Sequence, residues 1–78
     1  MKARLRSDLL DPHQMPLVMS AQTSLPYIPL DQLCNPTQEF EAFQPERIKD
    51  SEFNLIIISD KRDILLANSI DFNLTEGE

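Results

Sequence analysis

The sequence predicts a small α+β protein, a single domain whose core is a C-terminal antiparallel β-hairpin. Two observations predict this class. Two apolar runs, Leu55–Ile58 and Ile64–Leu66, flank a short polar link, and all six prolines lie at or before Pro45. Because each proline removes a backbone donor and favours extended conformations, the first part of the chain is expected to be irregular, and the hairpin to carry the fold.

The hairpin has apolar residues on both faces of its first strand, which indicates cover on two sides. Its turn, Asp60 to Asp63, contains no glycine, so we expect a type I-based loop rather than the tightest two-residue turn. The pattern predicts that Leu55, Ile57, Leu66 and Ile70 are buried. No proline guards the strand edges, so a strand from this chain, a second copy or a partner is expected to pair with them.

A short helix is expected to begin near Asn35, because asparagine is a preferred N-cap, Pro36 suits the first helical position and Gln38 can complete a capping box. Phe40 and Phe43 are three residues apart and would then share one helical face. Pro45 would end the helix.

The chain divides into an extended or irregular N-terminal arm, residues 1–33, and a helix-plus-hairpin unit, residues 34–78. Within the arm, MKARLRS alternates as a half-exposed strand does, and LVMSAQTSL is a second candidate strand. The remaining apolar residues of the arm form a strap over the protein's own core or over another chain. The sequence leaves both alternatives open.

The net charge of −6 lies in the second part of the chain. Ten acidic and four basic side chains occur in residues 34–78, whereas the first 33 residues are balanced. Such a surface repels phosphate backbones and favours basic protein surfaces, which argues against nucleic-acid binding. The longest apolar run is far shorter than a membrane span, and the basic N-terminus lacks the apolar core of a signal peptide, so we expect a cytoplasmic protein that binds no membrane.

No constellation of residues predicts catalysis, a cofactor or a metal. His13 and Cys34 are the single histidine and the single cysteine, and no orienting group accompanies them at local spacing. Asp60 and Asp63 lack the further oxygen ligands and the glycine bend of a calcium loop. The lone glycine, Gly77, lies in the C-terminal tail, which excludes glycine-rich phosphate loops.

An acidic cluster interleaved with aromatic residues is the candidate partner-binding site: Glu39, Phe40, Glu41, Phe43, Glu46 and Glu52. Charges steer encounter and rings supply affinity, whereas the alternative is a helix with its rings in the core. We therefore expect a non-catalytic acidic protein that binds a protein partner with a basic surface, as a regulator, inhibitor or antitoxin-like neutraliser. The alternatives are a structural accessory subunit or assembly factor of a larger complex, and a homodimer through a strand edge.

Overall fold

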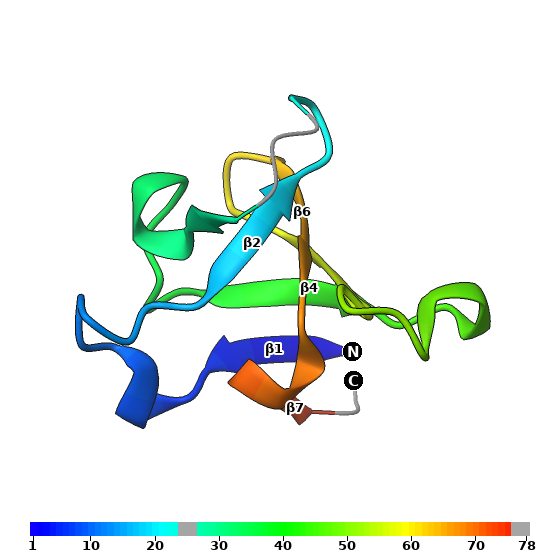
Figure 1. The fold of residues 1–78 in the computed structure, drawn as a ribbon, viewed down its shortest axis with the longest axis horizontal. Helices are drawn as coiled ribbons and strands as arrows, with labels where there is room; N and C mark the ends of the chain where they lie inside the picture. Colours follow the sequence, from blue (N-terminus) through cyan, green and yellow to red (C-terminus); the bar gives the residue numbers. More distant parts are fainter. Residues whose placement is uncertain (24–26, 76–78) are drawn as a thin grey trace.

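The computed structural model describes residues 1–23 and 27–75, and in them the chain forms one antiparallel sheet of seven strands (Figure 1). The strands are β1 (Lys2–Leu5), β2 (Leu17–Ser20), β3 (Ile28–Pro29), β4 (Glu39–Phe43), β5 (Leu55–Ile58), β6 (Ile64–Ala67) and β7 (Phe72–Thr75). Short 3₁₀ turns connect them: η1 (Ser7–Leu9), η2 (Leu30–Gln32), η3 (Glu46–Ile48) and η4 (Ser69–Asp71). No helix among the described residues is long and apolar enough to cross a membrane.

The strand order across the sheet is β3-β2-β6-β5-β4-β1-β7. The β5–β6 hairpin therefore lies at the centre. In Figure 1, β2 and β6 cross the direction of β1 and β4 steeply, which shows that the sheet is strongly twisted and curls around one of its faces. The core lies on that inner face and takes side chains from six of the strands and from η2: Ala3, Leu5, Val18, Leu30, Phe40, Ala42, Leu55, Ile57, Leu65, Ala67 and Phe72.

The predicted hairpin is present, but in its second strand Leu65 faces the core in place of Leu66. Leu55 and Ile57 are fully buried as expected, and Ile57 pairs with Leu65. Leu66 is only half-buried and points to the outer face. Because side chains alternate along a strand, a shift of one residue exchanges the two faces, and two consecutive leucines give no signal for which one is inside.

Ile70 is 68% exposed, contrary to the prediction. It lies in η4, where the side chain of Asn68 accepts a hydrogen bond from the Ile70 backbone N–H at 3.1 Å. This cap turns the chain out of the β6 direction before β7 begins. The period-2 pattern of β6 therefore does not extend to Ile70.

The predicted helix is wrong: residues 39–43 form β4, and the fold is mostly strand rather than α+β. Phe40 is fully buried whereas Phe43 is 52% exposed, because residues three apart lie on opposite faces of a strand. Pairing with β1 on one side and β5 on the other satisfies the backbone of β4. Tertiary hydrogen bonds and burial here override the local helix signals.

The capping residues act in a turn instead. The side-chain oxygen of Asn35 accepts a hydrogen bond from the Thr37 backbone N–H at 3.0 Å, and the Gln38 amide donates back to the Asn35 carbonyl at 3.0 Å. The Asn35 contact is that of an N-cap, but Gln38 donates to the Asn35 carbonyl instead of accepting from its N–H, so the predicted capping box does not form. The chain becomes extended at Glu39. The predicted cap contact of Asn35 is therefore present, whereas the predicted capping box and the predicted helix are wrong.

Both predicted N-terminal strands are present within their segments, and they cover the hairpin region inside the chain. β1 lies between β4 and β7, with Ala3 and Leu5 buried and Arg4 exposed. β2 pairs with β6. Since β4 covers the other edge of the hairpin, neither of its strands has a free edge. Across β1, the rings of Phe40 and Phe72 meet edge to face at 6.0 Å.

We expect Ile57→Ala to lower the free energy of unfolding by roughly 2–5 kcal/mol, because a fully buried isoleucine leaves a cavity at the centre of the sheet. Ile70→Ala removes the same atoms from an exposed site and should change the value by less than about 0.5 kcal/mol. Urea denaturation of both variants measures the difference. Equal effects would contradict the placement of β5 at the centre of the core.

Candidate protein-binding face

The outer face of the central strands carries a continuous row of apolar side chains. Phe43 of β4 pairs with Ile56 of β5, Ile56 pairs with Leu66 of β6, and Leu66 pairs with Met19 of β2. We call these four residues the outer row. Ile56, Leu66 and Met19 are half-buried, and Phe43 is exposed. A second row beside it contains Glu41, Ile58 and Ile64.

An apolar row on the solvent side of a sheet is unusual for an antiparallel sheet, which commonly alternates apolar and polar faces. Single exposed apolar residues need no explanation, but neighbouring ones indicate a binding surface. Here the cross-strand register joins them over four strands. The sequence predicts that both faces of β5 are covered. The described residues cover the outer face, with Ile56 and Ile58, only in part.

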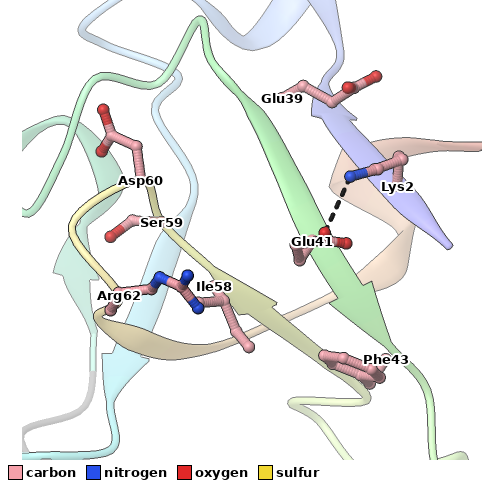
Figure 2. Close-up of a pocket in the computed structure, with 8 residues that line it drawn as sticks. All are labelled: Lys2, Glu39, Glu41, Phe43, Ile58, Ser59, Asp60 and Arg62. Atoms are coloured by element: carbon pink, nitrogen blue, oxygen red, sulfur yellow. Dashed lines mark hydrogen bonds and ion pairs between the residues drawn. The ribbon is translucent and has the colours of Figure 1, made fainter.

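A groove of about 420 Å³ opens at one end of this face (Figure 2). We call it the hairpin groove. Its walls come from β1, β4, the end of β5 and the loop between β5 and β6: Lys2, Glu39, Glu41, Phe43, Ile58, Ser59, Asp60 and Arg62. The volume suits one or two side chains of a partner, with apolar contacts at Phe43 and Ile58 and charged groups around them.

Ion pairs fix the β1–β4 wall of the groove. The Lys2 ammonium donates to a Glu41 carboxylate oxygen at 2.9 Å, and the Arg4 guanidinium lies 3.6 Å from Glu39. The hydrogen bond and charge of Lys2 hold the pKa of the Glu41 carboxyl below its ordinary value. Glu41 therefore stays ionised near neutral pH. All four side chains are well exposed, so these pairs position charges more than they stabilise the fold.

The hairpin loop supplies the opposite wall. The Ser59 hydroxyl accepts hydrogen bonds from the backbone N–H groups of Lys61 and Asp63, at 3.3 and 3.2 Å, and the Arg62 N–H donates to the Ser59 carbonyl at 2.9 Å. These bonds hold Arg62 at a φ of 68°, a left-handed conformation that favours glycine. The loop is longer than a two-residue turn, as the sequence predicted.

Arg62 extends from this strained position toward Ile58, inside the groove (Figure 2). Among the residues that the structure describes, its guanidinium makes no ion pair. The groove therefore contains a cation on a backbone fixed by Ser59, and the charge of this cation also acts on Glu41.

Three of the sequence-predicted site residues, Glu39, Glu41 and Phe43, line the hairpin groove. Phe40 lies in the core and has no exposed surface. Glu46 lies in η3, where its carboxylate is 3.8 Å from the Lys49 ammonium. These assignments depend on β4 being a strand, which sends Phe40 inward and its odd-numbered neighbours outward.

Glu52 belongs to a separate contact. Its two carboxylate oxygens accept from the Tyr27 hydroxyl at 3.0 and 3.1 Å, and the Tyr27 ring lies 5.8 Å from that of Phe53. The bond to Glu52 raises the pKa of the Tyr27 hydroxyl. The contact joins the segment before β3 to the segment before β5, and β2 and β6 lie between these two strands in the sheet. The structure thus separates Glu46 and Glu52 from the groove.

The sequence did not indicate Lys2, Ser59 or Arg62 as site residues. Lys2 is 39 residues from its partner Glu41, so only the β1–β4 register brings them together. Ile58 was expected on the outer face of the hairpin, but its place beside Phe43 depends on the β4–β5 pairing. The only local indication of a special role for Arg62 was that the turn contains no glycine, so that another residue could have to adopt a positive φ.

The two residues considered for nucleophilic chemistry have structural contacts. The Cys34 thiol is half-buried and lies 3.9 Å from the Leu30 carbonyl. Burial, reinforced by the charges of Asp60 and Asp63, raises the pKa of the thiol to about 11. The backbone N–H of His13 donates to Asp11 at 2.9 Å. Among residues 1–23 and 27–75, no three histidine, cysteine or acidic side chains gather as a metal site.

Comparison of the chain with protein-family models, with curated proteins and with solved structures finds no match in any of the three.

We expect Cys34 to react slowly with iodoacetamide in the folded protein at pH 8. A pKa of about 11 leaves on the order of a hundredfold less thiolate than a free thiol has. The unfolded thiol ionises at lower pH, so raising the pH from about 9 to about 11 should also lower stability. Mass spectrometry with and without denaturant measures the alkylation rate. Equal rates in both conditions would contradict the buried, protonated thiol.

Proposed function

We propose that this chain is a non-catalytic acidic protein that binds another protein through the outer row and the hairpin groove. It would act there as a regulator, inhibitor or antitoxin-like neutraliser. The observation that carries the proposal is the register that aligns Phe43, Ile56, Leu66 and Met19 on the solvent side of four strands. Binding energy concentrates in a few large side chains that fill pockets, and Phe43 ends this row beside the groove.

The charge distribution supports a partner that is basic around an apolar centre. Of the seven basic residues, Lys2, Arg4, Arg6 and Lys49 lie in ion pairs with acidic residues of this chain. Asp60, at the rim of the groove, has no such pair within the described part of the chain. A basic group of the partner can complete it, and the net charge of −6 would speed the encounter at low salt.

Arg62 gives the groove its selectivity in this proposal. A non-glycine residue at positive φ costs about 1–2 kcal/mol, and this cost supports a function for the side chain. Arg62 and Asp60 carry opposite charges on one loop beside Ile58. A segment with an apolar side chain between a carboxylate and a basic side chain complements this arrangement. The proposal places the protein in the cytoplasm, in agreement with its free cysteine.

We expect Phe43→Ala to weaken partner binding by about 2 kcal/mol, roughly thirtyfold, without loss of fold, because the ring is 52% exposed. The partner is obtained by in-cell cross-linking and identified by mass spectrometry, and its purified form is titrated calorimetrically. Ile70→Ala, which truncates a side chain that does not line the groove, is the matched control and should leave the affinity unchanged. Equal losses in both variants, or none in either, would contradict the assignment of the face.

Arg62→Gly should increase the stability of the free protein by about 1 kcal/mol, because glycine adopts the left-handed conformation without strain. The same change should weaken binding to the partner. Thermal unfolding and calorimetry measure the two effects. Lys61→Gly, in the same loop but not lining the groove, is the control and should give neither effect. A more stable variant with full affinity would show that the strain at Arg62 does not serve binding.

A further inference from the structure

The sheet ends in two edge strands of different character. β3 has two residues, one of them Pro29, and a short edge that contains proline resists pairing. β7 has four residues, Phe72–Thr75, with no proline and no charged side chain. Within the described residues it pairs only with β1. β7 therefore lacks the proline and the charged side chains that often protect an edge.

The register shows which backbone groups of β7 face outward. The Arg6 N–H donates to the Asp71 carbonyl at 3.1 Å, so Asp71 directs its backbone groups toward β1. In an antiparallel ladder this direction alternates with every residue. Asn73 and Thr75, which are opposite Arg4 and Lys2, therefore also bond to β1. The Phe72 C=O and the N–H and C=O of Leu74 are directed away from the sheet, whereas the Phe72 N–H donates to the Ser69 carbonyl within η4.

We propose that two copies of this chain associate through β7, in antiparallel orientation, to join their sheets. In each copy the Leu74 N–H donates to the Phe72 carbonyl of the other copy, and Asn73 lies on the two-fold axis opposite its own copy. This register uses two of the three outward backbone groups of β7 in each copy, the Leu74 N–H and the Phe72 C=O. It is self-complementary, as a two-fold interface must be.

The side chains agree with this register. Leu74 is 37% exposed on the same side of β7 as the buried Phe72, so pairing places it beside Phe72 of the second copy and extends the core. Asp71 comes opposite Thr75, and no like charges face each other within β7. Pairing with another protein's strand is the competing outcome. The second copy is favoured because its edge supplies the matching pattern of apolar side chains and backbone groups.

The interface is small, and both copies carry a charge of −6, so the dimer is weak and strengthened by salt. This dependence is opposite to that of the encounter with a basic partner, which separates the inference from the proposed function. Sedimentation equilibrium from micromolar to millimolar concentration, at low and high salt, measures it. A chain that remains monomeric throughout would overturn the inference.

Introducing a positive or a negative charge at Asn73 tests the two-fold register. Asn73→Lys and Asn73→Glu each place like charges opposite one another, and each should raise the dimer dissociation constant by roughly fivefold. An equimolar mixture of the two variants pairs opposite charges and should associate at least as tightly as the wild type. Far-UV circular dichroism confirms that both variants are folded. A mixture no tighter than its components would overturn the register.

Leu74→Pro removes an outward N–H without removing a bond to β1, and should weaken the dimer on the order of tenfold. Leu74→Ala retains the N–H and is the matched control, with a smaller effect. If Leu74→Pro unfolds the chain, the Asn73 mixture alone decides the inference. Equal dimerisation of the wild type and a folded Leu74→Pro variant would overturn it.

Discussion

The burial of β5 is the constraint on which the rest of the structure depends. Leu55 and Ile57 fill the inner face, while Ile56 and Ile58 make the outer face apolar. Such a strand is stable only at the centre of a sheet, with neighbours on both sides and cover on its faces. The hairpin partner β6 supplies one neighbour and β4 the other. The remaining strands extend the sheet on either side, β2 and β3 beyond β6, and β1 and β7 beyond β4.

A chain of 78 residues encloses a small core, and curling the sheet lets one layer cover itself. The contact between Phe40 and Phe72 shows how this works, because the two rings meet across β1 and join three strands on the inner face. The same curvature turns the second apolar face of β5 toward solvent. The outer row is thus a direct consequence of a sheet with one enclosed side, and it is the basis of the proposed protein-binding function.

The groove shows how a site arises from residues that are each ordinary. Glu41 is set by strand alternation, Lys2 by the β1–β4 register, and Arg62 by the hydrogen bonds of Ser59. None of these requires a motif. The strained backbone at Arg62 is the exception, since it costs free energy that a glycine would avoid. The strained backbone at Arg62 and the exposed apolar outer row both lower the stability of the free protein. In the proposed function both serve binding to the partner.

The hairpin, its longer loop, the strand at MKARLRS and the excess of acidic charge can all be predicted from the sequence, because they depend on neighbouring residues and simple periodicity. The sequence also placed Leu55 and Ile57 in the core. It could not choose between helix and strand for residues 39–43. The cap at Asn35 forms its local bonds in either case, and EFEAF matches both periods over so few residues.

Residues 39–43 form a strand because β1 and β5 pair with them through backbone hydrogen bonds. This strand then fixed the site: Phe40 turned inward, Phe43 turned outward, and Glu41 met Lys2 from the far end of the sequence. The phase of β6 was decided in the same way, because Leu65 rather than Leu66 pairs with Ile57 on the inner face. Pairing between distant strands satisfies hydrogen bonds and buries side chains at once, and no local pattern contains that information.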